Sequence, residues 1–224
     1  MTSRLSSSGI LIYMETGDTK TRLLDAAGAL VQTRGYHGFS FHDLASGVGI
    51  TTASIHYHFP TKAILGQALV KRYTLLFLNA LGKPDAAPPV QCLKHYVDIF
   101  RAALLEGRMC LCGMIGAEVD GVPAEVALEV RQFFAVNLTW LTSVFEAAGE
   151  RPTAAQAKAS LFLSTLEGAM LIARAGGDRN SFDEVTKTVL SVCSPPVQGG
   201  GTLKPKSRTG TRSPRPTGSS ASTG

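Results

Sequence analysis

Apolar residues recur every three to four positions along most of the chain, which places them on one face of an α-helix. The first such stripe covers residues 19–34, and Gly35 follows it where a glycine commonly ends a helix. No segment alternates apolar and polar residues for long enough to indicate a strand. The pattern therefore predicts an all-α protein of about nine helices.

Capping residues set the limits of two short helices that follow the first. Ser40 and Asp43 have the spacing of a capping box, which predicts a helix that begins after Ser40 and is broken at residues 47–49. Thr51 is suited to cap a second short helix, and Pro60 ends it. The sequence thus predicts two short helices joined by a tight glycine turn.

Longer amphipathic helices are predicted from there to residue 193. Pro123 stands where a proline favours the first turn of a helix. Thr153 with Gln156 and Ser181 with Glu184 repeat the capping-box spacing. The predicted helices cover residues 63–81, 89–106, 108–119, 123–148, 153–175 and 181–193.

The two ends of the chain differ from its helical middle. Residues 194–224 contain 22 Gly, Pro, Ser and Thr residues, which cannot build a core and predict a disordered tail. Residues 1–17 predict a flexible arm, and its short apolar run lacks the features of a signal peptide. Met14 offers a second start of translation, and a disordered arm that begins at Met1 is the alternative.

Charge is distributed unevenly along the sequence. The formal net charge of +5 at pH 7 divides into +4 for residues 1–83, −4 for residues 84–193 and +5 for residues 194–224. A basic N-terminal part beside an acidic one is typical of a protein that presents one end to phosphate. The basic tail either adds salt-sensitive DNA affinity or is a solvated appendage.

Several classes of protein are excluded or disfavoured by composition and motifs. The sequence has no apolar run long enough to cross a membrane. Four cysteines are too few for a disulfide scaffold and lack zinc spacing, so we expect a reduced cytoplasmic compartment. We see no acid–base pair, phosphate loop, nucleophile elbow or metal cluster, and we therefore expect no enzyme activity, metal or cofactor.

The two short helices and the turn between them form a helix-turn-helix pattern. The second helix would carry small hydroxyls, imidazoles and a phenol outward, where they can reach base edges and phosphates. Lys62 lies at the start of the next helix, where the helix dipole disfavours a cation unless a phosphate is present. The residues expected to contact DNA are Ser40, Thr51, Thr52, Ala53, Ser54, His56, Tyr57, His58 and Lys62.

This segment resembles the N-terminal DNA-binding domain of the tetracycline-repressor (TetR) family over residues 18–77. The resemblance implies a homodimer that places two helix-turn-helices in successive major grooves. It also implies a helical domain, here residues 84–193, that binds an effector and dimerises through the last two helices. The matching positions are Ala26-Ala27, Gly35-Tyr36, Phe39-Ser40, Asp43-Leu44-Ala45, Val48-Gly49-Ile50-Thr51, Ser54-Ile55-His56-Tyr57-His58-Phe59-Pro60-Thr61-Lys62 and Leu65.

The resemblance also implies roles within the predicted recognition helix. Thr52, Ala53 and Ser54 would contact bases. Tyr57 and His58 would contact phosphate or base, and Lys62 would contact phosphate. His56 departs from the family, which most often has tyrosine there, so the base preference near it is open. Each histidine is alternatively a partly buried helix residue that makes a local hydrogen bond.

The second half carries apolar side chains that either line an effector cavity or form plain core. Asn137 and Trp140 lie three residues apart on one predicted helix, and we favour this pair as ligand contacts because it joins an apolar body to a polar group. The other candidates are Phe100, Leu104, Met109, Met114, Phe133, Phe134, Leu141, Phe162 and Leu166.

Cys110 and Cys112 form the sharpest local feature of this half. At this spacing they point to different sides of a helix, which disfavours chelation or a disulfide. With Ala117-Glu118 the segment resembles electrophile-sensing members of the family, and a thiol near a helix N-terminus and Arg108 would have a lowered pKa. The alternative is two buried, unreactive thiols.

The last two predicted helices carry small residues that would allow close helix packing in a four-helix dimer interface: Ala155, Ala159, Ser160, Ser164, Gly168 and Ala169. We therefore expect a homodimeric repressor that a small molecule or electrophile releases from double-stranded operator DNA. An effector-independent architectural or division-control protein on the same fold is the alternative. An enzyme built on a helical bundle is the least favoured interpretation.

Overall fold

The computed structural model describes residues 18–193. Within this range the chain forms nine α-helices and one short 3₁₀-helix with no strand, which confirms the predicted all-α class. No helix in the described range is both long and apolar enough to span a bilayer. The predicted N-terminal arm, the alternative start at Met14 and the predicted tail lie outside the described residues.

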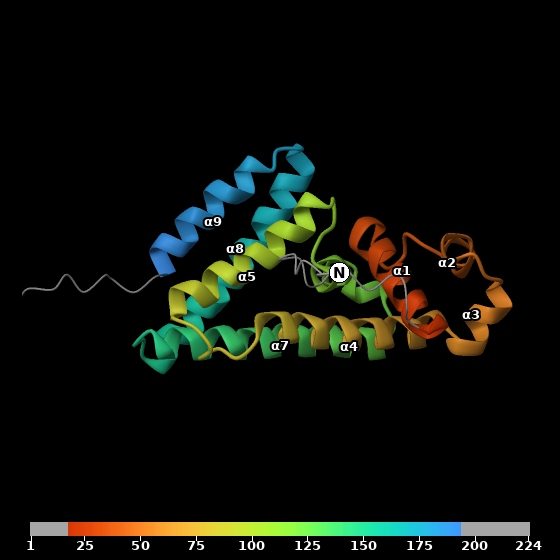
Figure 1. Ribbon diagram of the computed structural model, residues 1–224, viewed down its shortest axis with the longest axis horizontal. Helices are drawn as coiled ribbons and strands as arrows, with labels where there is room; N and C mark the ends of the chain where they lie inside the picture. The colour runs from red at the N-terminus through yellow and green to blue at the C-terminus, as the bar shows by residue number, and fades with distance from the viewer. Residues whose placement is uncertain (1–17, 194–224) are drawn as a thin grey trace, which may run out of the picture.

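The first three helices form one end of the molecule, and the fourth runs from that end into the rest (Figure 1). Gly35, with a positive φ of 83°, ends the first helix as predicted, and its N–H donates to the Val31 carbonyl at 2.9 Å. The four helices are α1 (Thr19–Arg34), α2 (Phe41–Val48), α3 (Thr52–His58) and α4 (Lys62–Leu81).

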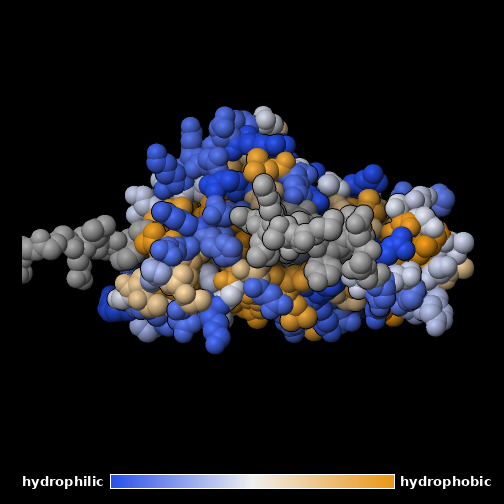
Figure 2. All heavy atoms as spheres, in the orientation of Figure 1, coloured by the Kyte–Doolittle hydropathy of each residue, from blue (hydrophilic) through white to orange (hydrophobic). Residues whose placement is uncertain are grey.

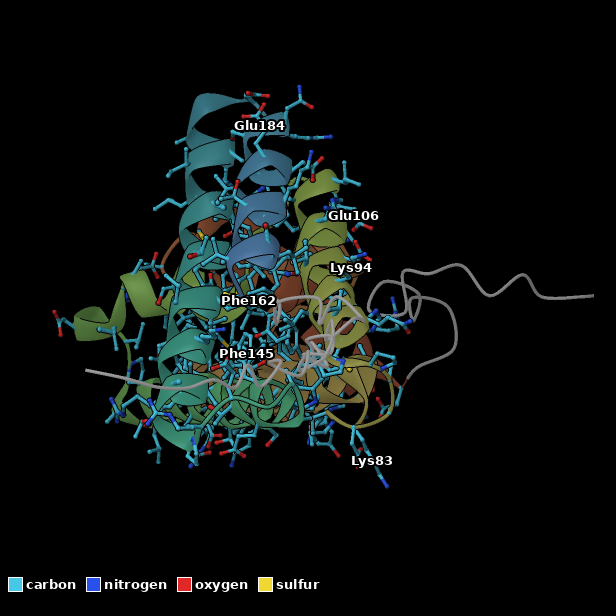
Figure 3. The ribbon with its side chains drawn as sticks, turned by 90° about the vertical axis from the view of Figure 1, so that its left-hand side faces the viewer. Lys83, Lys94, Glu106, Phe145, Phe162 and Glu184 are labelled. Carbon is cyan, nitrogen blue, oxygen red and sulfur yellow. The ribbon has the colours of Figure 1, made fainter. Side chains whose placement is uncertain are left out.

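The remaining helices form the larger end. α7 packs along α4 and α8, and α8 packs along α9 (Figure 1). Figure 3 shows α8 and α9 side by side, with Phe145 and Phe162 near the lower part of α8. These elements are α5 (Pro89–Leu105), α6 (Leu111–Ala117), the 3₁₀-helix η1 (Val119–Gly121), α7 (Ala124–Ala147), α8 (Pro152–Gly176) and α9 (Asn180–Cys193).

Two of the predicted capping boxes are wrong. α8 begins one residue before Thr153, because Pro152 already has the backbone geometry of a first turn. α9 begins before Ser181, because the Asp178 carboxylate accepts a hydrogen bond from the Asn180 N–H at 3.0 Å. The predicted helix over residues 108–119 is also shorter, since Cys110 is its N-cap.

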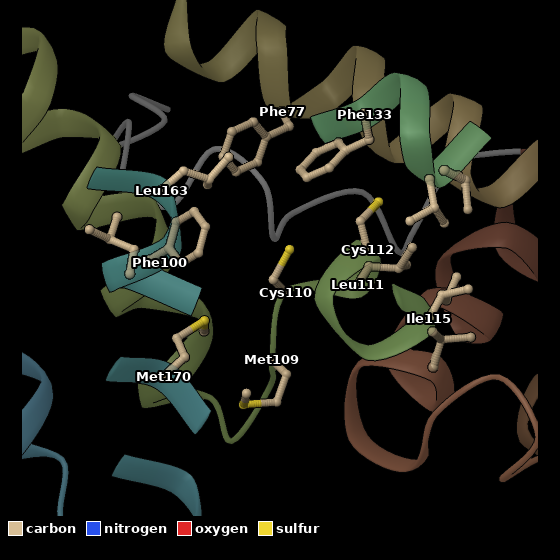
Figure 4. Close-up of a cluster of buried hydrophobic side chains, with 14 of the residues drawn as sticks. Phe77, Phe100, Met109, Cys110, Leu111, Cys112, Ile115, Phe133, Leu163 and Met170 are labelled. Carbon is tan, nitrogen blue, oxygen red and sulfur yellow. The ribbon is translucent and has the colours of Figure 1, made fainter. Parts of the chain in front are cut away.

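Aromatic side chains from several helices form the centre of the core. The ring of Phe77 on α4 lies 5.4 Å from Tyr96, 6.1 Å from Phe100 and 5.5 Å from Phe133. All four rings are buried, and the close-up in Figure 4 shows three of them around the Cys110 segment. This cluster fixes α4 against α5 and α7, so the fourth helix connects the two ends rigidly. On the face seen in Figure 2, polar side chains dominate over α5 and α9.

Candidate nucleic-acid interface and its link to the C-terminal helices

Local hydrogen bonds build the helix-turn-helix as the sequence predicts. The Asp43 carboxylate accepts from the Ser40 N–H at 2.7 Å, and the Ser40 hydroxyl accepts from the Asp43 N–H at 3.2 Å. The Ser40 hydroxyl also donates to the carboxylate at 2.6 Å, and this bond together with the one from the Ser40 N–H favours the ionised form and lowers the pKa of Asp43. Gly49 adopts a left-handed conformation with φ of 76°, and the Thr51 hydroxyl accepts from the Ser54 N–H at 3.2 Å. The predicted capping box and cap are thereby confirmed.

Buried apolar residues orient the two short helices. Leu44 on α2 and Ile55 on α3 are fully buried, and Phe59 follows them into the same core. The Arg22 guanidinium on α1 donates to the carbonyl of Val48 at 3.1 Å, which satisfies a free carbonyl at the end of α2. These contacts fix which face of α3 points outward.

The outward face of α3 carries part of the side chains that the sequence assigns to DNA, because Ser54 and His58 are half-buried. Thr52, Ala53 and Tyr57 are exposed, and Tyr57 keeps 85% of its surface in contact with solvent. Its ring packs in a T-shaped arrangement with the neighbouring His58 ring, at 5.2 Å between centroids. A large aromatic side chain placed this way on a short, well-braced helix is available to a groove or a phosphate.

His56 has contacts of its own within the protein. Its Nδ1 lies 3.2 Å from the Pro60 carbonyl, and its ring packs edge-on against Phe41 at 4.9 Å. The hydrogen bond agrees with the alternative interpretation, a local structural role, but His56 is exposed and not partly buried. A base contact by His56 stays a prediction.

Lys62 is held by the protein instead of pointing outward. Its ammonium donates to the Phe39 carbonyl and lies over the rings of Tyr36 and Phe39, at 4.9 and 4.3 Å from their centroids. Partial burial lowers the pKa of Lys62. A carbonyl and two aromatic faces therefore also explain a cation at this helix start, and a phosphate contact by Lys62 stays a prediction.

A partly buried joint connects the helix-turn-helix to the C-terminal helices. The Glu118 carboxylate, at the end of α6, accepts hydrogen bonds from the N–H of Tyr36 at 2.8 Å and of His37 at 3.2 Å. Gly35 makes this approach possible, because a Cβ there would lie 2.2 Å from Glu118 Oε1. The sequence indicated Gly35 as a helix end but gave no sign of its contact with Glu118.

A second set of contacts holds the C-terminal end of α1. Gln32 and Met109 exchange two hydrogen bonds, from the side-chain amide to a carbonyl at 3.0 Å and from N–H to carbonyl at 3.1 Å. Arg174 on α8 donates to the carbonyls of Thr33 at 2.6 Å, Gln32 at 3.2 Å and Gly107 at 3.4 Å. A movement of α8 or of the segment before α6 would therefore move α1.

The predicted effector contacts are mostly core. Phe100 and Phe133 belong to the central aromatic cluster, and Met114 is half-buried against it. Asn137 accepts from the Tyr96 hydroxyl at 2.9 Å. It also donates to the Phe133 carbonyl at 2.8 Å.

Trp140 uses its indole in the same way, because its N–H donates to the Gly82 carbonyl at 2.8 Å. The polar groups of Asn137 and Trp140 are thus bonded within the protein, and the preference for this pair as ligand contacts is not supported.

A pocket of about 430 Å³ that is open to solvent lies elsewhere, on the surface between α7 and α8. Among the lining residues, only Phe134 was predicted from the sequence as an effector contact. Glu167 was missed, because a single acid within an apolar helix gives no spacing signal. The lining consists of Phe134, Leu138, Ser160, Leu163, Ser164 and Glu167.

Cys110 and Cys112 are buried, which contradicts the expected lowering of a thiol pKa. Burial and the neighbouring Glu167 raise the pKa of both thiols well above the usual range. The Gly113 N–H does donate to the Cys110 sulfur at 3.4 Å, as a helix N-terminus would allow, but burial dominates. Arg108 forms an ion pair with Glu106 at 2.8 Å instead of serving a thiolate.

We accordingly expect the native protein to resist thiol alkylation. After brief treatment with N-ethylmaleimide, mass spectrometry should find Cys110 and Cys112 unmodified. Both thiols are buried and stay protonated, so the reagent meets no accessible thiolate. The same treatment in denaturant should modify both residues fully. Rapid modification of either cysteine in the native protein would restore the electrophile-sensing interpretation.

Two family models match the chain. The model for bacterial regulatory proteins of the tetR family matches residues 23–69. The model for the C-terminal domain of LmrA/YxaF-like transcriptional regulators matches residues 89–188. A comparison with curated proteins finds no match.

Solved structures agree with these matches. A TetR transcriptional regulator from Legionella pneumophila is 31% identical with a TM-score of 0.75, over 80% of this chain and 99% of that one. A TetR-family regulator from Agrobacterium tumefaciens is 32% identical with a TM-score of 0.71, over 77% and 96%. The reduced form of E. coli NemR, at 17% identity, a TM-score of 0.68 and coverage of 80% and 100%, shares the fold.

Proposed function

Since this chain belongs to the TetR family of DNA-binding transcriptional regulators, we propose that it is a one-component repressor released from its operator by a small molecule. The family and the fold are those of regulators and not of enzymes. We assign DNA binding to residues 18–77, and effector binding and dimerisation to residues 84–193. The observation that carries the proposal is the joint at Glu118 and Arg174, which connects α1 and the loop after it to α6 and α8.

The outward face of α3 supports the DNA-binding assignments. Thr52, Ala53 and Tyr57 are exposed, and Ser40 and Thr51, which are also exposed, serve as helix caps. Two such helices in a dimer would enter successive major grooves of one operator.

The dimer that we propose uses α8 and α9. Five large apolar side chains on their outer surfaces are exposed: Leu161, Leu171, Ile172, Val185 and Val192. Ser164 and Gly168 lie on the same side of α8 and permit close approach. The other small residues act differently from the prediction, because Ala155, Ala159 and Ala169 are buried within the protomer. A second copy would cover this apolar surface.

Replacing Ile172 by glutamate should dissociate this dimer. Ile172 is 65% exposed in the protomer, so the substitution leaves its fold intact, but the interface would contain two unpaired carboxylates. We expect at least about hundredfold weaker dimerisation by light scattering and analytical ultracentrifugation. Leu75→Glu on α4, where the leucine is 63% exposed, is the matched control and should stay dimeric. A dimer unaffected by I172E would place the interface elsewhere.

Release by a ligand follows from the joint if the ligand favours one position of α6 and α8. A molecule changes operator affinity only by its difference in affinity between two conformations. Glu118, Met109 and Arg174 hold the end of α1 and the loop after it, so a shift of α6 or α8 changes the spacing of the two recognition helices. Coupling of this kind is commonly worth about 1–3 kcal/mol.

The proposal is tested with the DNA that adjoins the gene of this protein. Footprinting should show a twofold-symmetric protected site, and reporter expression from it should rise when the gene is deleted. Protection of many scattered genomic sites, with none next to its own gene, would favour an effector-independent architectural protein instead. Reporter expression that falls on deletion would identify an activator.

A further inference from the structure

Four of the protein's five histidines lie in or next to the helix-turn-helix, which otherwise carries almost no charge. Residues 35–61 contain no Lys or Arg, and Asp43 is their only acid. The next cation along the chain, Lys62, is turned inward and donates to the Phe39 carbonyl. Cations supply most of a protein's affinity for DNA phosphates. The imidazoles are therefore the only side chains of this segment able to supply positive charge, and histidine ordinarily gains its proton between pH 8 and pH 5.

The ring of His56 is oriented so that one nitrogen bonds the protein and the other does not. Its Nδ1 lies 3.2 Å from the Pro60 carbonyl, and the ring packs against Phe41 with 4.9 Å between centroids. A carbonyl only accepts, so Nδ1 carries the hydrogen of this bond, and Nε2 of the neutral ring keeps a lone pair. The side chain is exposed, and no residue within 18–193 bonds Nε2. This nitrogen is thus available to a partner outside the protein.

The folded protein offers a positive charge on His56 no partner. No carboxylate within residues 18–193 forms an ion pair with His56. Two other histidines differ in this respect, because the charges of His42 and Asp43 interact, as do those of His58 and Asp18 at the start of α1. The remaining titratable groups at this end of the molecule are Lys20, Arg22, Arg34, His37, Tyr57 and Lys62.

The position of His56 favours a phosphate contact over a base contact. In a helix-turn-helix the first residues of the recognition helix contact bases, and the preceding helix crosses the DNA backbone. His56 is the fifth of the seven residues of α3, and its ring lies against Phe41, the first residue of α2. α2 and α3 together form the tip of the molecule that is remote from α8 and α9 (Figure 1). A phosphate oxygen only accepts, so it bonds Nε2 only when that nitrogen carries a proton.

We propose that His56 takes up a proton when the protein binds its operator and contacts a DNA phosphate as an imidazolium. The proton comes from solvent, and each half-site of a dimer takes up one. The bound state then holds more protons than the free state, so operator affinity rises as the pH falls from 8 to 6. The inference rests on the proposed function, because it concerns binding to the same operator.

The proton linkage is measured on the full chain with the operator that footprinting identifies, by fluorescence anisotropy at pH 6, 7 and 8. We expect binding to be at least about fivefold tighter at pH 6 than at pH 8, since a dimer carries two such histidines. Calorimetry in two buffers of different ionisation enthalpy should show uptake of about one proton per dimer at pH 7. The slope of log Kd against log salt concentration should be steeper at pH 6 than at pH 8 by about 1–2, as two added phosphate contacts require. Affinity and salt slope that do not change with pH, without proton uptake, would overturn the proposal.

His56→Gln keeps a polar side chain and removes the titratable ring. It should reduce the difference in affinity between pH 6 and pH 8 to at most about twofold and make the salt slope independent of pH. His95→Gln on α5 is the matched control, because His95 is exposed and its Nε2 likewise lies near a carbonyl, that of Ala80 at 2.8 Å. His42→Gln tests a neighbouring histidine whose charge Asp43 already balances.

Both control variants should keep the pH dependence of the parent protein. A dependence that survives H56Q, or one that H42Q removes instead, would contradict the assignment to His56. Thermal unfolding checks the fold of each variant. The proton count of the parent protein needs no variant, so it tests the proposal independently of how H56Q folds.

A duplex of the same length and shuffled sequence separates this inference from the proposed function. Operator binding that does not change with pH contradicts the proton uptake and leaves the proposed repressor intact. Proton-linked binding to both duplexes alike, with no protected site next to the gene, supports the phosphate contact and contradicts the repressor. Tight binding to the operator alone, with a pH dependence that H56Q removes, supports both.

Discussion

Tyr57→Ala should lower operator affinity by at least about thirtyfold while leaving the fold and the dimer unchanged. The ring is 85% exposed on α3 and makes a T-shaped contact with His58, so its removal costs little stability. A dimer loses the contact twice, once in each half-site, and one good contact is commonly worth about 1–3 kcal/mol. Fluorescence anisotropy with operator DNA measures the loss, and thermal unfolding checks the fold.

Two variants sharpen this test. Tyr57→Phe keeps the ring and removes the hydroxyl, so it separates a hydrogen bond to phosphate or base from apolar packing in the groove. Leu128→Ala removes an exposed apolar side chain from α7, outside the helix-turn-helix, and should bind operator normally. Unchanged operator binding by Y57A would mean that α3 does not face the DNA.

Gly35→Ala should destabilise the protein by about 3 kcal/mol. Two costs combine at this position. The φ of 83° is unfavourable for alanine, and the new methyl group would lie 2.2 Å from Glu118 Oε1. Moving that carboxylate breaks its hydrogen bonds to the N–H of Tyr36 and His37. Urea unfolding followed by circular dichroism measures the change.

Gly47→Ala is the matched control for this substitution. Gly47 lies within α2 at an exposed position, and a Cβ there would meet no atom within 4 Å. Alanine should therefore stabilise α2 by about 0.5–1 kcal/mol. If G35A and G47A changed the free energy of unfolding alike, the Gly35–Glu118 joint would not contribute to stability as we infer.

Short-range signals explain why the helix-turn-helix was predictable. Ser40 with Asp43, Gly49 and Thr51 form their contacts within a few residues, so their spacing alone indicates the geometry. The same kind of signal failed at Thr153 and Ser181, because a nearby proline or aspartate starts each helix earlier. A capping motif predicts that a helix begins, but competing caps decide where.

The functional joint could not be predicted, because its partners are far apart in the sequence. Glu118 binds the backbone of Tyr36 over 82 positions, and Arg174 binds the carbonyl of Thr33 over 141. Neither contact leaves a periodic or spaced pattern. The protonation of Glu167, Cys110 and Cys112 likewise depends on burial among neighbours that no local sequence window contains.

The sequence by itself determined the all-α class, the helix-turn-helix and the outward side chains of its second helix, because periodicity and caps are local properties of the chain. Tertiary structure decided the rest. It turned Lys62 inward, kept Cys110 and Cys112 neutral, and buried the Glu167 carboxyl beside Cys110. Desolvation and long-range contacts control these features, and both arise only when distant segments of the chain pack together.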